Sequence, residues 1–110
     1  MTQRLTTEQL QEAVVGLEQW TLGPERGGVL SREFAFSDFV QAFGFMTQVA
    51  LHAEKRDHHP EWSNVYHRVW VVLTTHDANG ITGKDVELAH FMDHIATGFP
   101  DKGLTKRGGE

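Results

Sequence analysis

Two adjacent histidines, His58 and His59, followed by Pro60, are the residues of this sequence best suited to chemistry. A third histidine, His76, follows the apolar stretch 69–73, which is typical of a buried strand. Imidazole has an unperturbed pKa of about 6.5, so it can donate or accept a proton near neutral pH. Several imidazoles in one cleft could therefore supply the acid and the base of one reaction, each worth roughly 10²–10⁴-fold in rate.

The segment 62–75 predicts the structure that would bring these histidines together. It is rich in β-branched and aromatic residues and too long for one strand, so we predict a hairpin with its turn at 66–68. In a hairpin the start of one strand lies beside the end of the other, which would place His76 near the histidine pair. We expect one pocket mouth to hold the three imidazoles of His58, His59 and His76 together with the carboxylates of Asp57 and Asp77. The carboxylate of Asp57 could orient one of the rings. Spacing alone favours a plainer interpretation, in which the pair lies in a solvated loop and His76 caps a strand.

The remaining elements predict an α+β fold. Amphipathic patterns predict helices at 6–17, 38–55 and 82–95, the first and last opened by capping boxes. Strand patterns at 20–22 and 29–36 precede the central helix. The order α-β-β-α-β-β-α, with short turns inside each strand pair, predicts a four-stranded antiparallel sheet with three helices packed on one face.

The central helix and the chain end carry two further expectations. We predict a buried stripe on this helix, flanked by Val40 and Val49: Phe39, Phe43, Met46, Ala50 and Ala53. Gly44 costs helix stability, which indicates close packing against another element. Residues 1–110 are interpreted as a single domain, of which 98–110 predict a frayed tail.

Composition excludes several classes of function. The 110 residues carry a net charge of −5, which argues against nucleic-acid binding, and they include no cysteine. No apolar run is long enough to cross a bilayer, and the N-terminus lacks the apolar core of a secretory signal. We therefore expect a cytoplasmic protein without a membrane partner.

Two other residue sets have weaker claims to chemistry. His90 and His94 have the i, i+4 spacing that can chelate zinc, but a solvated helix face explains them equally, and we predict no metal site. Trp62 could border the histidine site as a flat wall for an aromatic ligand, or it could simply fill the core.

Four motifs together are more specific than any spacing. DHHPEW at 57–62, NVY at 64–66, LTTH at 73–76 and GITGKD at 80–85 closely resemble the pterin-4a-carbinolamine dehydratases, and the resemblance covers about 20–96. It implies a hydro-lyase that dehydrates 4a-hydroxytetrahydropterin to the quinonoid dihydropterin, in tetrahydrobiopterin recycling after aromatic amino acid hydroxylases. It also implies that the reaction needs no metal or organic cofactor.

The resemblance further implies which residues act. The three active-site histidines of the family correspond to His58, His59 and His76, and an acidic residue near its site corresponds to Asp85. Its substrate-contacting segments correspond to seven residues: Asp57, His58, His59, Thr74, Thr75, His76 and Asp77. Our hypothesis is that His59 or His76 is the acid and another of the three the base, while His58 positions the pterin.

The resemblance also implies partners. Family members form dimers or tetramers through helices and sheet edges, and in animals they bind a homeodomain transcription factor as a dimerisation cofactor. We therefore expect a homodimer or homotetramer, with a hydroxylase or a regulatory protein as a further partner. The alternative function is a protein-interaction module with little or no catalysis.

Overall fold

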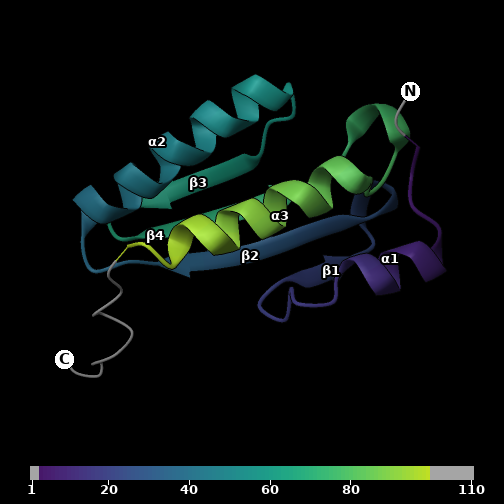
Figure 1. The fold of residues 1–110 in the computed structure, drawn as a ribbon, viewed down its shortest axis with the longest axis horizontal. Coiled ribbons are helices and arrows are strands. Elements are labelled where there is room, and N and C mark those ends of the chain that lie inside the picture. Colours follow the sequence, from purple (N-terminus) through teal and green to yellow (C-terminus); the bar gives the residue numbers. More distant parts are fainter. Residues whose placement is uncertain (1–2, 100–110) are drawn as a thin grey trace.

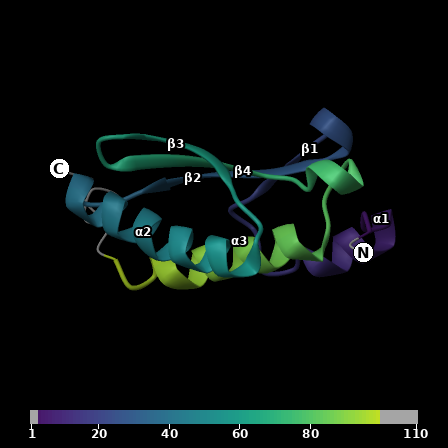
Figure 2. The same cartoon turned by 90° about the horizontal axis from the view of Figure 1, so that it is seen from above.

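The computed structural model describes residues 3–99, and it has a sheet on one side and helices on the other (Figures 1 and 2). In chain order the elements are α1 (Thr7–Ala13), β1 (Thr21–Gly23), the short helix η1 (Glu25–Gly27), β2 (Val29–Ala35), α2 (Phe39–Arg56), β3 (Glu61–Val65), β4 (Arg68–Leu73), the short helix η2 (His76–Ala78) and α3 (Gly83–Ala96). The sheet has four strands in the order β1-β2-β4-β3, and every pair is antiparallel. The predicted fold class is confirmed.

The β3–β4 hairpin has the turn that the sequence predicted. The strands are joined at Tyr66 and His67, and Tyr66 adopts a left-handed conformation with φ 54°. Glu61 lies opposite Val72, so the start of β3 is beside the end of β4. This register brings the chain before β3 and the chain after β4 to the same end of the sheet.

The helix starts follow from local hydrogen bonding. The side chain of Asp38 accepts a hydrogen bond from the amide of Gln41 at 2.8 Å and opens α2. Thr6 and Thr82 form the two predicted capping boxes, which open α1 and α3. These caps set where each helix begins, and the α3 cap lies in the candidate site described below.

The buried face of α2 differs from the predicted stripe. The structure buries Ala42, Phe45, Val49 and Ala53. Of these, Ala53 was predicted in the stripe and Val49 at its flank, whereas Ala42 and Phe45 were not predicted. Three members or neighbours of the predicted stripe are exposed, Phe39 at 46%, Val40 at 70% and Phe43 at 56%. The prediction was wrong for Phe39, Phe43 and Ala50, which are exposed. The reason is that α2 is apolar around much of its circumference, so periodicity alone cannot show which stripe meets the sheet.

Gly44 has the close neighbour that its position predicted. A Cβ atom at Gly44 would lie 3.0 Å from the ring of Phe99. Phe99 itself packs edge-on against Phe36 and Phe45, with ring centroids 6.1 and 6.4 Å apart. The prediction of a frayed tail is therefore wrong at Phe99, while residues 100–110 lie outside the described part of the chain.

Across residues 3–99, none of the helices has the length and apolar character needed to span a membrane.

Candidate active site

The end of α2 positions the histidine pair. Asp57 follows the last helical residue in a left-handed conformation, φ 53°, which aspartate tolerates better than most side chains. After this turn the amide of His58 donates to the carbonyl oxygen of Ala53 at 3.0 Å, which closes the end of the helix. Pro60 cannot continue a helix, and β3 begins directly after it. His58 therefore leaves α2 at a defined point, and its ring lies against Asp85 of α3.

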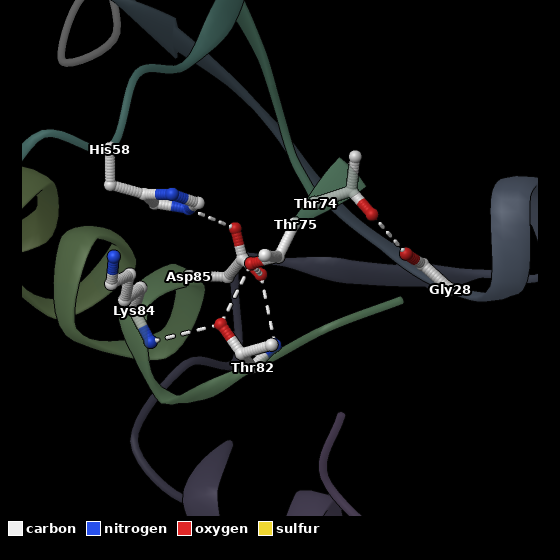
Figure 3. A network of polar contacts seen from close by, with 7 residues as sticks. All are labelled: Gly28, His58, Thr74, Thr75, Thr82, Lys84 and Asp85. Atoms are coloured by element: carbon white, nitrogen blue, oxygen red, sulfur yellow. Dashed lines mark hydrogen bonds and ion pairs between the residues drawn. The ribbon is translucent and has the colours of Figure 1, made fainter. Parts of the chain in front are cut away.

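Asp85 is the centre of a buried polar network that joins His58 to the chain after β4 (Figure 3). The residue is 0% exposed. One carboxylate oxygen lies 2.6 Å from Nε2 of His58. The other lies 2.7 Å from Oγ1 of Thr75 and 2.9 Å from the amide nitrogen of Thr82. A buried carboxylate is tolerated when donors surround it in this way.

The direction of each hydrogen bond follows when Asp85 is ionised. A carboxylate only accepts, so Thr75 donates its single hydroxyl proton to Asp85. The hydroxyls of Thr75 and Thr82 lie 2.7 Å apart, and Thr82 must be the donor between them. Nε2 of His58 likewise carries a hydrogen that it donates to Asp85. Nδ1 of neutral His58 is then the nitrogen free to accept a proton.

The segment after β4 is anchored before it reaches His76. Oγ1 of Thr74 donates to the carbonyl oxygen of Gly28 at 2.7 Å, and Thr75 forms an isolated β-bridge with Gly80. His76 then begins η2 with an exposed side chain. These contacts hold His76 at the end of the sheet from which β3 starts.

Glu61, the first residue of β3, forms a charged pair with Arg26 of η1. Arg26 donates to both carboxylate oxygens of Glu61, at 2.7 and 3.0 Å. The Arg26 guanidinium holds the pKa of Glu61 below its ordinary value, and the nearby charge of His76 adds a smaller lowering. Glu61 in turn raises the pKa of Arg26.

His59 has a different neighbour from His58. Its Nε2 lies 2.9 Å from the carboxylate of Glu54 on α2, and 56% of its side chain is exposed. Among residues 3–99, no hydrogen bond joins the ring of His59 or His76 to that of His58. The structure thus joins His58 to Asp85 and Thr75 in one network, and places His59 and His76 as exposed groups at the same end of the sheet.

The remaining predicted residues do not join the network. Asp57 and Asp77 are exposed. Trp62, which was expected either to border the site or to fill the core, is half buried and packs against the hydrophobic core. Sequence reasoning missed Thr82 as a network member, and its only signal was its place in the α3 capping box. It also missed Glu54 and Glu61, because nothing in EKRDHHPEW distinguishes their carboxylates from that of Asp57.

The two histidines with zinc-chelating spacing, His90 and His94, lie apart from this site. Nε2 of His90 lies 3.4 Å from the carbonyl oxygen of Ala13, and His94 is exposed near the end of α3. In the part of the chain that the structure describes, no three His, Asp or Glu side chains are arranged to hold a metal ion.

The Arg26–Glu61 pair predicts a stability that depends on acidity. Because the folded-state pKa of Glu61 lies below its ordinary 4.5, the pair stabilises the fold above that pH, and the contribution is lost as pH falls through the folded-state pKa. Both side chains are about half exposed, so Glu61→Gln should lower Tm by less than about 4 °C near neutrality. The difference should vanish in strong acid. Thermal melts across the acid range measure it, with Glu18→Gln as the control, and a Tm difference that is constant with pH would contradict it.

The fold and the site define a small α+β domain that holds a histidine–carboxylate pair at one end of an antiparallel sheet. A model of the family described as pterin 4 alpha carbinolamine dehydratase matches residues 3–95. This chain belongs to that family.

Individual relatives agree with the family. A protein of Bradyrhizobium sp. (strain BTAi1 / ATCC BAA-1182), named "Putative pterin-4-alpha-carbinolamine dehydratase", is 57% identical over 96 residues, which cover 87% of this chain and 96% of that protein. A protein of the same name from Burkholderia pseudomallei (strain K96243) is 50% identical over 95 residues, covering 86% and 93%.

Two solved structures share the fold. One, described as a transcriptional coactivator/pterin dehydratase from Brucella melitensis, has a TM-score of 0.79 and 49% identity, and the match covers 84% of this chain and 98% of the other. The second, a pterin dehydratase-like protein described as a RuBisCO assembly factor of the alpha-carboxysome, has a TM-score of 0.61, 20% identity and coverage of 71% and 89%. The second likeness concerns the fold alone.

Proposed function

We propose that this protein is a hydro-lyase that dehydrates a 4a-hydroxytetrahydropterin to the quinonoid dihydropterin. The observation that carries the proposal is the buried contact of His58 with Asp85, which also holds Thr75. This contact ties the two segments that family resemblance marks as substrate-contacting, 57–59 and 74–77. A pterin lying against these segments would have His58, His59 and His76 around it. The substrate would be the carbinolamine that an aromatic amino acid hydroxylase leaves.

The reaction requires two proton transfers. The C4a–O bond breaks as the N5 electron pair forms the C4a–N5 double bond, and the leaving oxygen takes a proton to become water. A ring nitrogen then gives up a proton, so the products are the quinonoid dihydropterin and water. Nothing is oxidised or reduced, so the reaction needs no redox cofactor, and we propose that histidines supply its acid and base without a metal or organic cofactor.

The hydrogen bonding suggests how the histidines share these steps. His58, with its Nε2–H held by Asp85, presents Nδ1 as a base for a ring N–H. His59 and His76 are exposed and can exchange protons with water, which suits the acid that protonates the leaving hydroxyl. This assignment gives His58 a direct chemical role in place of the positioning role first assigned to it.

A stopped-flow assay tests the function directly. The carbinolamine is generated in place by a hydroxylase, and its decay to the quinonoid dihydropterin is followed by ultraviolet absorbance with and without the purified protein. Catalysed decay supports the proposal, and decay at the uncatalysed rate at high protein concentration refutes it.

We also propose that the protein forms a homo-oligomer through the outer face of α2. Large apolar side chains are exposed on this helix: Phe39, Val40, Phe43 and Leu51. The rings of Phe39 and Phe43 are 5.7 Å apart, so they form one continuous patch. An apolar helix face of this kind is stable in water when a second copy covers it.

Substitution of Phe43 tests the oligomer. Phe43→Asp should weaken self-association by about 100-fold or more, because it places a charge in an apolar contact. It should leave the monomer folded, since Phe43 is 56% exposed. Light scattering after size-exclusion chromatography measures the mass, with Val15→Asp as an exposed control outside α2. A wild-type monomer at micromolar concentration would contradict the proposal.

The same exposed face favours a second function, a protein-interaction module. One similar structure carries the description transcriptional coactivator/pterin dehydratase, which pairs both roles in one name. The alternative predicts that the stopped-flow assay shows no catalysis although the protein is folded. Dehydration by the Phe43→Asp variant would show that the chemistry is independent of the α2 face.

A further inference from the structure

A cavity adjoins His58 on the side that faces α2 and α3. It has a volume of about 280 Å³ and lies between the C-terminal end of α2 and the N-terminal end of α3. His52 and Arg56 line it from α2, Lys84 and Glu87 line it from α3, and His58 forms part of its wall. The imidazole of His58 is therefore shared between this cavity and the network of Asp85.

The walls of the cavity are held in place by contacts. The ring of His52 stacks on Phe91, with centroids 3.7 Å apart and planes at 9°. Its Nε2 lies 3.1 Å from the carboxylate of Glu87. Gly83 has no side chain, and a Cβ atom there would meet nothing within 4 Å, so the mouth is open at the start of α3.

The charges that line the cavity are mainly positive. The guanidinium of Arg56 lies 3.8 Å from the carboxylate of Glu87, and the same carboxylate also contacts the ring of His52. One carboxylate is therefore shared by two basic groups. Lys84 forms no ion pair within residues 3–99, and its side chain lines the cavity beside His58. The chain as a whole carries a net charge of −5. A cavity with two permanent cations and one carboxylate is thus a local exception that suits an anionic ligand.

We propose that this cavity receives the substituent at C6 of the pterin and favours a substituent that ends in a phosphate or carboxylate. The inference rests on the proposed function, in which His58 faces the reacting part of the ring. C6 is two bonds from C4a through N5, so a substituent at C6 begins next to the atoms on which His58 acts. Ligand pockets usually enclose roughly 300–1,000 Å³, so a cavity of about 280 Å³ is suited to a short side chain.

A matched pair of ligands tests the subsite. Both are 7,8-dihydropterins with a trihydroxypropyl group at C6, and one carries a terminal phosphate monoester. Titration calorimetry gives the two Kd values for the wild-type protein. We expect the phosphate ester to bind about tenfold more tightly or better, because charge-assisted hydrogen bonds are the strong ones. The preference should shrink as salt is raised.

Variants that each remove one positive charge test whether Lys84 and Arg56 cause the preference for the phosphate ester. Lys84→Gln and Arg56→Gln should each reduce the ratio of the two Kd values by roughly threefold to tenfold. Lys55→Gln removes the same charge one residue from Arg56 but does not line the cavity, and it should leave the ratio as in the wild type. Both target side chains are exposed, so the variants should fold.

The outcomes separate this inference from the proposed function. Equal Kd values for the two ligands, or a ratio that neither variant changes, overturn the subsite while pterin binding stands. Failure of both ligands to bind the wild-type protein overturns the proposed function and the subsite with it. A phosphate preference that falls in Lys84→Gln and Arg56→Gln, and not in Lys55→Gln, supports the subsite.

Discussion

Replacing His58 with alanine should lower kcat/KM for carbinolamine dehydration by roughly 10²–10⁴-fold, the usual contribution of a positioned acid or base. The reason is that His58 holds its Nε2–H against Asp85 and is left with Nδ1 to accept a proton from the substrate. The stopped-flow assay measures the loss. His94→Ala is the matched control, since His94 is an exposed histidine near the end of α3.

The same assay on His59→Ala and His76→Ala ranks the other two imidazoles. Rate losses in all three variants would support a site built from the three histidines. A wild-type rate in His58→Ala would refute the role of His58 as the base. Unchanged rates in both His59→Ala and His76→Ala would refute the proposal that one of these two is the acid.

Replacing Asp85 with asparagine should cost a similar 10²–10⁴-fold in kcat while the fold survives, because the change acts on the tautomer of His58. The amide oxygen of asparagine can still accept from Thr75 and Thr82, but its NH₂ group then faces Nε2 of His58. Two donors cannot share a hydrogen bond, so the ring must move its hydrogen to Nδ1. The nitrogen proposed as the base is then already protonated.

Three readouts distinguish this effect from a simple loss of structure. Nitrogen NMR of the histidines should show His58 change from the Nε2–H to the Nδ1–H tautomer. Thermal melts should show Asp85→Asn near the wild type, while Asp85→Ala loses about 1–3 kcal/mol for each buried donor left without a partner. Glu12→Gln, the same change on an exposed residue of α1, is the control. A wild-type rate in Asp85→Asn would show that the tautomer does not matter.

Local pattern predicted most of the fold. The capping residues Thr6, Asp38 and Thr82 marked the helix starts because their bonds join residues two or three positions apart. The β3–β4 hairpin was predictable because its partners are close along the chain. The sequence could not predict which face of α2 is buried. An apolar residue such as Phe43 fits the helical repeat of hydrophobic residues whether it packs in the core or lies on the surface.

For the candidate site, too, some features follow from the sequence and others only from the tertiary structure. The sequence by itself determined which groups are available, the histidines 58, 59 and 76 and their carboxylates, and the hairpin that brings them to one end of the sheet. Only the tertiary structure decided that His58, and neither of the others, contacts Asp85, 27 residues away, and that His59 contacts Glu54. Such pairings depend on how α2 and α3 pack together, because a hydrogen bond requires atoms within about 3 Å and residue order alone does not set that distance.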